Sequence, residues 1–356
     1  MSSTASPQPD PGKRADQVAR KWVEWLWEQR VPKGMFSLVV GKPGQGKSLW
    51  AAYLAAELSK TGDVIFSNRE DPLAQVIRPR LEAAGARLNR VHFFEKTTLP
   101  EDLEVLEAMI RTVKAKAVIL DPIAAHLTPS MFNDQDVRKA LTPVAKMAER
   151  TGCAVIGVSH TVKYISLKAH PLTAVGGSGG GLTGAARAIF AFGVDPADKD
   201  QRALVPLKFN LGPMPLSMTF ELDEIEFLDD KDRLEAVAGR LVKVSDSEVI
   251  NAMAVLAGIG GDGSGGKTAE KREAAAEWLT NYLSLGRRPV NDIKEDAIQV
   301  GNISWGTLRR AAQDIEIEIS RVGFGTGSQS YWGLPDGHPG LIAVDVDGDE
   351  GDDGSE

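Results

Sequence analysis

The stretch Gly41-Lys42-Pro43-Gly44-Gln45-Gly46-Lys47-Ser48 fills the pattern G-x-x-x-x-G-K-[ST] without a mismatch. A short apolar run at residues 36–40 precedes it and predicts a buried parallel strand, and residues 49–58 after it are prone to form a helix. Strand, glycine turn and helix together direct backbone N–H groups and a helix N-terminus towards an anion. A chance glycine loop is the alternative, but it does not account for the agreement of length, spacing and flanks.

We therefore predict a loop that holds the phosphates of a nucleotide. Lys47 is expected on the β- and γ-phosphates of ATP, and the Ser48 hydroxyl is expected to ligate Mg²⁺. The predicted binding residues are Gly41, Lys42, Pro43, Gly44, Gln45, Gly46, Lys47, Ser48 and Leu49.

The charge of the chain is unevenly distributed. The 356 residues carry a formal net charge of −8, but seven carboxylates and no Lys or Arg lie in residues 341–356. The rest of the chain is therefore close to neutral, so the acidic total does not argue against nucleic acid as a partner. We expect the acidic end to be disordered and solvated, with competition against nucleic acid as the alternative.

Apolar runs and cysteine content indicate the environment of the protein. No apolar run approaches the roughly 20 residues of a membrane-spanning helix, and the polar start is no secretory signal. The single cysteine, Cys153, lies in an apolar run and is expected to be a buried core residue. These features predict a cytoplasmic protein with no membrane contact and no disulfide.

Strands that alternate with helices predict an α/β fold, in which a mostly parallel sheet is covered on both faces. Closely spaced strands at 187–193, 202–209 and 215–222 predict hairpins that extend the sheet at one edge. The other expected strands are residues 36–40, 63–67, 91–94, 117–121 and 153–159, and the expected helices are residues 15–30, 49–58, 71–86, 99–114 and 136–151.

A glycine-rich stretch at 258–266 predicts a flexible linker to a second domain. Helices are expected at 269–285, at 290–300 and from the N-cap Ser304 to Asp314, followed by strands at 315–320 and 330–334 around a glycine tip at 323–327. Three helices and a β-ribbon predict a winged helix. The predicted division is a disordered N-terminus at 1–18, an ATPase domain at 19–248, a linker at 249–268, a winged helix-turn-helix domain at 269–336 and an acidic disordered tail at 337–356.

Two acids are expected close to the glycine loop. Asp121 ends an apolar strand, so its carboxylate reaches the edge where open α/β sheets bind ligands and can help Ser48 to hold Mg²⁺. Glu70 follows the strand at 63–67 and would orient the attacking water if that strand neighbours the loop strand. The alternatives are an acid that merely ends a strand and a surface acid in a turn.

His160 ends the strand at 153–159 in the same way as Asp121 ends its own. From there it can sense the γ-phosphate and pass that state to the segment that follows, in which residues 174–182 are rich in glycine. We expect this segment to be a mobile switch. A histidine that is simply satisfied at the end of a strand is the alternative.

Ten short stretches also carry a resemblance to a known family. They are Trp25-Leu26-Trp27, Arg30-Val31-Pro32-Lys33-Gly34, the loop Gly41 to Ser48, Glu70-Asp71-Pro72, Pro79-Arg80-Leu81-Glu82-Ala83-Ala84-Gly85, Leu120-Asp121-Pro122, Val137-Arg138-Lys139-Ala140-Leu141, His160-Thr161-Val162-Lys163, Gly184-Ala185-Ala186-Arg187 and Lys208-Phe209-Asn210. Together they cover roughly residues 22–245, in order. In these stretches the sequence resembles the RecA-type ATPases of the plasmid RepA and DnaB-like hexameric helicase group, and more closely the ATPases of phages, plasmids and prophages that are often encoded with primases.

This resemblance implies a RecA-like P-loop core that uses ATP and Mg²⁺ and assembles into a ring, expected to be a hexamer. Glu70 would be the catalytic base, Asp121 the second acid at the metal and His160 the sensor, beside Lys47. Lys208 would reach into the neighbouring subunit's ATP site as a trans finger. Asn210 stands where an arginine is common in the helicases, which makes Arg187 an alternative finger.

The resemblance also implies where DNA is contacted. Residues 164–182 would face single-stranded DNA in a central channel, with Lys163 and Lys168 as the cations of this region. In the predicted winged helix, the third helix would present Arg309 and Arg310 to duplex DNA and the wing would present Arg321. A winged helix used for protein contacts or ring assembly is the alternative.

Two functions of different classes are open at this point. The first is a ring-forming, DNA-stimulated ATPase that acts as a replicative helicase or its loader for a mobile element, together with a primase or origin-binding protein. The second is an ATP-switched DNA-binding regulator that does not unwind DNA. A small-molecule kinase is disfavoured, because such an enzyme rarely needs a winged helix and the chain shows no lid-like arginine cluster.

Overall fold

The computed structural model describes most of the chain. The described residues are 13–95, 98–128, 133–166, 168–176, 179–228, 234–247, 250–258, 265–301, 303, 305–322 and 329–341. Several predictions fall outside them: the disordered start at 1–12, the centre of the linker at 259–264, the N-cap Ser304, the glycine tip at 323–327 and the acidic residues 342–356.

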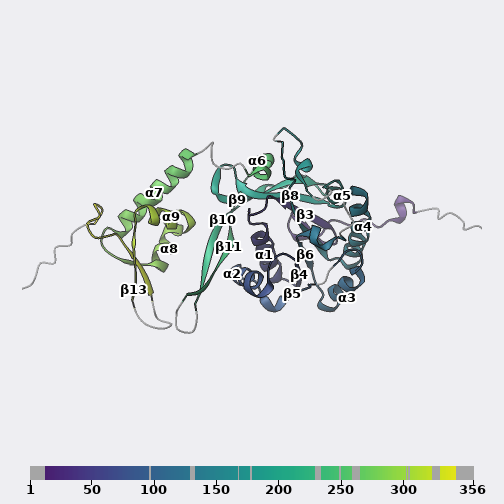
Figure 1. Ribbon diagram of the computed structural model, residues 1–356, viewed down its shortest axis with the longest axis horizontal. Helices are drawn as coiled ribbons and strands as arrows, with labels where there is room; N and C mark the ends of the chain where they lie inside the picture. Colours follow the sequence, from purple (N-terminus) through teal and green to yellow (C-terminus); the bar gives the residue numbers. More distant parts are fainter. Residues whose placement is uncertain are drawn as a thin grey trace, which may run out of the picture.

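Nine strands form one large sheet in the order β11-β10-β9-β8-β3-β7-β6-β4-β5 (Figure 1). The parallel part consists of β3 (Phe36–Gly41), β4 (Val64–Asn68), β5 (Val91–Phe93), β6 (Ala117–Asp121), β7 (Ala154–His160) and β8 (Ala188–Asp195). Antiparallel hairpins add β9 (Asp198–Phe209), β10 (Ser217–Leu228) and β11 (Leu234–Ser247). The predicted α/β class with a mostly parallel sheet is confirmed, and β11 is an edge strand that the sequence analysis did not predict.

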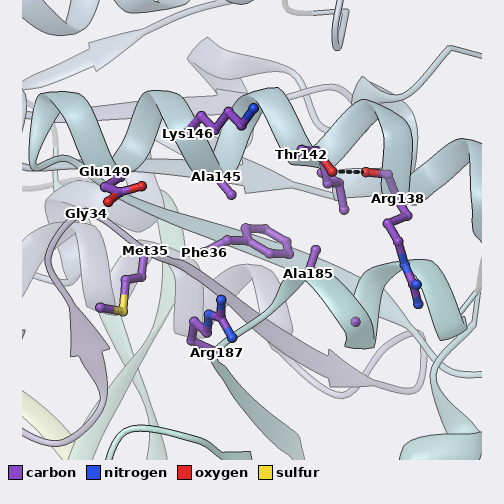
Figure 2. A pocket seen from close by; sticks show the side chains of 12 residues that line it. Gly34, Met35, Phe36, Arg138, Thr142, Ala145, Lys146, Glu149, Ala185 and Arg187 are labelled. Carbon is purple, nitrogen blue, oxygen red and sulfur yellow. Dashed lines mark hydrogen bonds between the residues drawn. The ribbon is translucent and has the colours of Figure 1, made fainter. Parts of the chain in front are cut away.

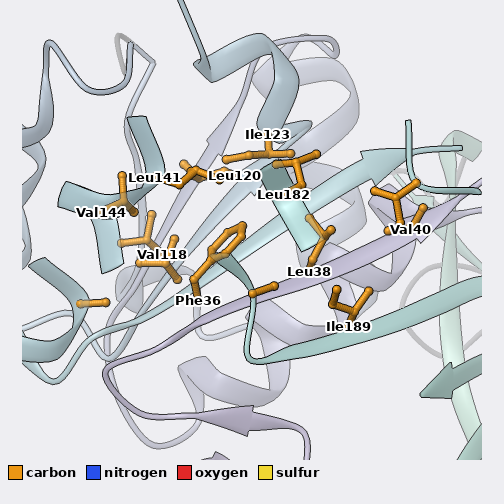
Figure 3. Close-up of a cluster of buried hydrophobic side chains, with 14 of the residues drawn as sticks. Phe36, Leu38, Val40, Val118, Leu120, Ile123, Leu141, Val144, Leu182 and Ile189 are labelled. Atoms are coloured by element: carbon orange, nitrogen blue, oxygen red, sulfur yellow. The ribbon is translucent and has the colours of Figure 1, made fainter. Parts of the chain in front are cut away.

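Alternate residues of the central strand β3 are buried on opposite faces of the sheet. Phe36, Leu38 and Val40 join the core under α3 (Leu103–Val113), α4 (Asp134–Thr151), α5 (Gly179–Ala185) and α6 (Ala252–Ala257), as Figure 3 shows in part. Val39 joins the core under α1 (Lys47–Ser59) and α2 (Arg78–Ala83). Burial on both faces explains the continuous apolar runs of the strands. Shorter helical turns are η2 (Leu73–Ile77), η3 (Leu88–Arg90), η4 (Ile123–His126) and η5 (Pro171–Ala174).

The predicted helix at 15–30 is wrong. This segment contains the short turn η1 (Ala15–Gln17) and a hairpin of β1 (Trp25–Trp27) and β2 (Val31–Pro32). Trp25 stacks on Phe209 of β9, and Trp27 packs against Tyr53 of α1. These tertiary aromatic contacts, which are not visible in a helical spacing pattern, override the local preference.

The glycine run expected to be a mobile loop is partly helical. Residues 179–182 belong to α5, which packs on α4. A Cβ on Gly181 would lie 2.7 Å from the carbonyl oxygen of Asp134, and one on Gly184 would lie 3.0 Å from a guanidinium nitrogen of Arg138. Glycine is therefore needed here for close helix packing. The prediction of a mobile loop used glycine content alone, which does not distinguish close packing from mobility. Gly177 and Ser178 lie outside the described residues.

The C-terminal part has its own small core. Three helices, α7 (Gly265–Leu283), α8 (Val290–Gln299) and α9 (Trp305–Asp314), accompany a sheet of β12 (Arg288–Pro289), β14 (Gln329–Gly333) and β13 (Glu318–Val322). Leu279, Ile293, Leu308 and Trp332 are buried together there. In Figure 1 this part lies beside the β10–β11 ribbon, with α9 towards it.

Candidate functional site

The glycine loop joins β3 to α1 with the backbone shape that the motif predicts. Gly44 has φ +75° and Gly46 has φ +90°, a left-handed conformation that side chains with a Cβ rarely adopt. A Cβ on Gly41 would overlap the carbonyl oxygen of Phe192, because β8 passes directly beside the loop. Apart from Gly44 and its two chain neighbours, no heavy atom of the described chain lies within 4 Å of the Cβ position of Gly44, so the loop is open on that side.

Lys47 places a buried ammonium group inside this loop. Lys47 is only 5% exposed. Its Nζ donates to the Lys42 carbonyl oxygen at 2.8 Å and lies 3.1 Å from His160 Nδ1. Burial lowers the pKa of Lys47 to about 8, against the opposing effect of Asp121 and Glu70. Within the described part of the chain, neither hydrogen-bonding contact of the ammonium is an anion, so the loop holds a cation suited to receive one.

Asp121 ends β6 at the same edge and is buried beside Ser48. Burial raises the pKa of Asp121 to about 6, and a hydrogen bond from the Ser48 hydroxyl opposes that rise. Asn68, at the end of β4, donates to Asp121 Oδ2 at 3.4 Å. Its Oδ1 accepts from the backbone N–H groups of Glu70 and Asp71, at 3.0 and 2.7 Å. Asn68 thus positions both Asp121 and Glu70. The sequence analysis missed it, and its only signal was a polar residue at a strand end.

Glu70 reaches the loop although its strand does not adjoin the loop strand. The condition under which Glu70 was expected there is wrong, because β7 and β6 lie between β3 and β4. The turn after Asn68 nevertheless brings Glu70 Oε1 to 3.7 Å from His160 Nε2. Burial and the neighbouring Lys47 lower the pKa of His160, so its neutral ring accepts from the lysine at Nδ1. Lys47, His160 and Glu70 therefore form one row along the mouth of the loop.

Three further hydrogen bonds hold the apex of the loop, and sequence reasoning missed all of them. Lys42 donates to the carbonyl oxygen of Ala257, the last residue of α6. Arg202 of β9 donates to the carbonyl oxygen of Gln45 at 3.2 Å, and Gln45 Oε1 accepts from the backbone N–H of Val194 at 3.1 Å. No motif signals these contacts, since α6, β8 and β9 lie far from the loop in the sequence.

The segment after His160 is closed at its base and exposed at its tip. Thr161 bridges Val175, and the backbone N–H of Gly176 donates to the His160 carbonyl oxygen at 2.9 Å. Between these ends Lys163 and Lys168 are exposed, and Tyr164 is 93% exposed. Cations beside an exposed aromatic ring are typical of a surface that holds single-stranded nucleic acid. The predicted DNA cations Lys163 and Lys168 thus lie in one exposed loop that is tied to the end of β7.

Lys208 and Arg187 lie at the opposite end of the sheet from the loop. Lys208 pairs in register with Ile189, which is beside Leu38 of β3. Its Nζ donates to the carbonyl oxygens of Thr183 and Ala186, at 2.7 and 3.0 Å. The structure therefore places Lys208 away from its own chain's loop, and its role as a trans finger stays a prediction.

Arg187 is exposed and lines a cavity of about 610 Å³ between α4 and the α5–β8 junction. Figure 2 shows its guanidinium group pointing into this space, with Phe36 between it and Ala145 of α4 and with Arg138 at the other end. The other lining residues are Gly34, Met35, Leu141, Thr142, Ala145, Lys146, Glu149, Gly184 and Ala185. The cavity lies at the start of β3, whereas the glycine loop follows its end, so the two are separate places.

The remaining predicted DNA residues belong to the C-terminal part. Arg309 and Arg310 lie on α9, where each faces a carboxylate of the large sheet. Arg321 lies on β13, and its side chain is outside the described residues. The structure does not bring these arginines to the glycine loop.

The donors at the loop fit a magnesium nucleotide better than a metal held by protein alone. In the described chain no group of three or more His, Cys, Asp and Glu could hold a metal ion. Ser48 and Asp121 are hydrogen bonded at the loop, and hydroxyl and carboxylate oxygens are ligands that Mg²⁺ uses together with phosphates.

None of the described helices is both long and apolar enough to cross a membrane.

Comparison with protein families supports a P-loop ATPase. The AAA domain family model matches residues 8–164, a part of the chain that holds the glycine loop, Glu70, Asp121 and His160. Two curated relatives, both DNA repair protein RadA, are from Streptococcus pneumoniae and Bacillus subtilis. Each is 25% identical, over 137 and 142 residues, which cover 37% and 38% of this chain and 31% and 30% of the relatives. The chain therefore spans less than a third of the length of the curated relatives it matches.

Solved structures with some likeness include an ATPase domain, at 16% identity and a TM-score of 0.42. That comparison covers 53% of this chain and 82% of the other. A DnaB-like replicative helicase, solved in a study of its interactions with primase, has 17% identity and a TM-score of 0.43. That comparison covers 53% of this chain and 55% of the helicase chain.

Proposed function

We propose that the protein is an ATP-hydrolysing, DNA-associated motor of the RecA type. One observation carries the nucleotide part of this proposal: the buried ammonium of Lys47 stands inside a glycine loop with a carbonyl oxygen and a neutral imidazole as its contacts. A phosphate group is the anion that such a loop, opening on a helix N-terminus, accepts best. The AAA domain match over the same residues supports ATP as the nucleotide.

The row of polar residues at the loop supports hydrolysis as well as binding. Glu70 is a carboxylate that can accept a hydrogen bond from the attacking water, and Asn68 fixes the turn that presents it. Ser48 and Asp121 would hold Mg²⁺, which supplies charge stabilisation at the phosphates. Lys47 would leave His160 for the phosphates, because an anion binds an ammonium better than a neutral ring does.

His160 would then report the nucleotide state to the exposed loop. Its ring loses the lysine when phosphate binds, and its carbonyl oxygen already holds Gly176 at the base of that loop. Lys163, Tyr164 and Lys168 at the tip provide charge and a stacking surface for single-stranded DNA. The relatives named DNA repair proteins support DNA as the partner.

A replicative helicase or helicase loader of a mobile element, working as a ring and with a primase or origin-binding protein, is the fullest form of this proposal. Arg187 and Lys208 support the ring, because they lie at the end of the sheet opposite their own loop, where a neighbouring subunit can be reached. The runner-up is an ATP-switched DNA-binding regulator. It is favoured by one observation, the C-terminal part of three helices and a ribbon with its own core, which suits a winged helix.

Hydrolysis and strand displacement separate the two functions. The motor predicts ATP hydrolysis that single-stranded DNA stimulates and that Lys47→Ala abolishes, together with displacement of one strand of a duplex with a fixed polarity. The regulator predicts hydrolysis that ignores single strands and a full-length Lys47→Ala variant that still binds duplex DNA. Glu57→Gln, at a partly exposed position on α1, is a matched control that should leave both readouts unchanged.

A further inference from the structure

Helix α9 docks on strands β9 and β10 of the large sheet through two ion pairs. Arg310 Nε lies 3.5 Å from Asp200 Oδ2 on β9, and Arg309 Nη1 lies 3.7 Å from Glu224 Oε2 on β10. The side chains of Arg310 and Asp200 are 26% and 22% exposed, so this pair is largely covered, whereas the second pair is more open. The contact joins the C-terminal part to the ATPase part across more than 80 residues of chain.

These two arginines are the same pair that would meet phosphates if α9 entered a DNA groove. A guanidinium group binds carboxylate and phosphate with the same fork of N–H donors, so it cannot serve both at once. Burial lowers the pKa of Arg202, and the nearby Asp200 carboxylate opposes that fall, so Asp200 also faces a second arginine. The acids of β9 and β10 therefore occupy the positions that DNA phosphates would take.

We propose that α9 is a DNA-contacting helix that its own chain keeps away from DNA, and that Asp200 and Glu224 are the residues that hold it in this docked position. This inference rests on the proposed association with DNA. Duplex DNA competes with Asp200 and Glu224 for Arg309 and Arg310, so the apparent affinity for duplex is reduced by the fraction of molecules in which α9 is docked. Because both pairs are partly exposed and screened by salt, docking is weak enough to be reversible.

The part of β9 that holds Asp200 also contacts the nucleotide loop. Asp200 is two residues from Arg202, which donates to the carbonyl oxygen of Gln45 in the glycine loop. The docked helix and the nucleotide loop are thus held by the same short stretch of strand. Asp200 therefore contacts α9, and Arg202, two residues further along β9, contacts the nucleotide loop.

Neutral variants of the two acids test the proposal in the full-length protein. Asp200→Asn with Glu224→Gln should raise the affinity for a short duplex by about three- to tenfold at low salt. Glu235→Gln, which removes an exposed charge from β11, controls for the general loss of negative charge and should change the affinity by less than twofold. Adding Arg309→Gln and Arg310→Gln to the double variant should abolish the gain.

A distance measurement without DNA reports docking itself. Labels at Val237→Cys on β11 and Leu285→Cys after α7 are both exposed, while Cys153 is buried with a pKa raised to about 12 and stays unlabelled. The wild-type background should give one narrow distance distribution at low salt, and the double variant a broad one. A narrow distribution in both, with equal duplex affinities, would overturn the proposal.

The proposal and the proposed function fail in different ways. If the distances broaden in the double variant but duplex affinity does not rise, α9 is released without gaining DNA and the inference is wrong. That result leaves intact the hydrolysis stimulated by single-stranded DNA, which depends on the exposed loop at residues 163–168. If single-stranded DNA stimulates no hydrolysis in the wild-type protein, the motor function fails whatever the state of α9.

Discussion

Replacing Lys208 by methionine should lower the stability of the protein as well as slow its ATP hydrolysis. The ammonium of Lys208 donates to two carbonyl oxygens, Thr183 O at 2.7 Å and Ala186 O at 3.0 Å, and thereby ties β9 to the end of α5. Burial and the nearby Arg187 lower the pKa of Lys208, so the group is partly shielded from water. Hydrogen bonds from a charged donor contribute about 1.5–3 kcal/mol each when buried, and partial exposure of this side chain reduces the sum to about 1–2 kcal/mol.

Urea unfolding of the full-length protein measures this difference. For a domain of this size, about 1–2 kcal/mol corresponds to a fall in Tm of roughly 2–8 °C. Arg187→Met is the matched control, because Arg187 is exposed and its substitution should change the free energy of unfolding by no more than about 0.5 kcal/mol. If Lys208→Met keeps full stability yet loses hydrolysis, the bonds to α5 are not its role and a direct part in a neighbouring site becomes the better explanation.

Three further predictions concern the loop, a helix contact and the exposed tip. Gly41→Ala should abolish nucleotide binding or folding, as measured by nucleotide titration and circular dichroism, because its Cβ would overlap the Phe192 carbonyl oxygen; unchanged nucleotide affinity in the variant would be inconsistent with the close approach of β8. Hydrogen bonds from Arg150, then from Arg111, lower the pKa of Glu107 to about 2 from 4.5, so this folded-state pKa lies below the unfolded one. The stabilisation is therefore present above about pH 4.5 and lost as the pH falls towards about 2; Glu107→Gln should lower stability by about 1 kcal/mol or less at pH 7, and a deficit that persists at pH 2 would contradict this assignment. Tyr164→Ala should weaken binding of single-stranded DNA by about 1–3 kcal/mol with unchanged nucleotide affinity, measured by fluorescence anisotropy, and Tyr164→Phe should retain binding; loss of binding in both variants would show that stacking is not the cause.

The parallel sheet and the phosphate loop were predictable because both depend on local patterns. The strand expected at residues 117–121 matches β6 residue for residue, since an apolar run that is buried on both faces ends clearly at the acid Asp121. The loop motif fixed Lys47 and Ser48, and the strand-end rule brought Asp121 and His160 to the same edge.

What escaped prediction depends on contacts between distant segments. The hairpin at residues 25–32 forms because Trp25 and Trp27 find aromatic partners far along the chain. Glu70 reaches the site through a turn capped by Asn68, although its strand is three places from the loop strand. Arg202 contacts the loop only because β9 folds back over it, so no spacing within the sequence could have indicated its role.

The most direct test of the account is the rate of ATP hydrolysis by the full-length protein, with and without single-stranded DNA. Hydrolysis should require Mg²⁺, rise several-fold with single-stranded DNA, and fall by two orders of magnitude or more, roughly the contribution of a positioned general base, in Glu70→Gln. The same variant should still bind nucleotide, because Lys47 and the glycine loop are intact. Hydrolysis in Glu70→Gln at the wild-type rate, or a wild-type protein that binds ATP and hydrolyses none with DNA present, would contradict the account.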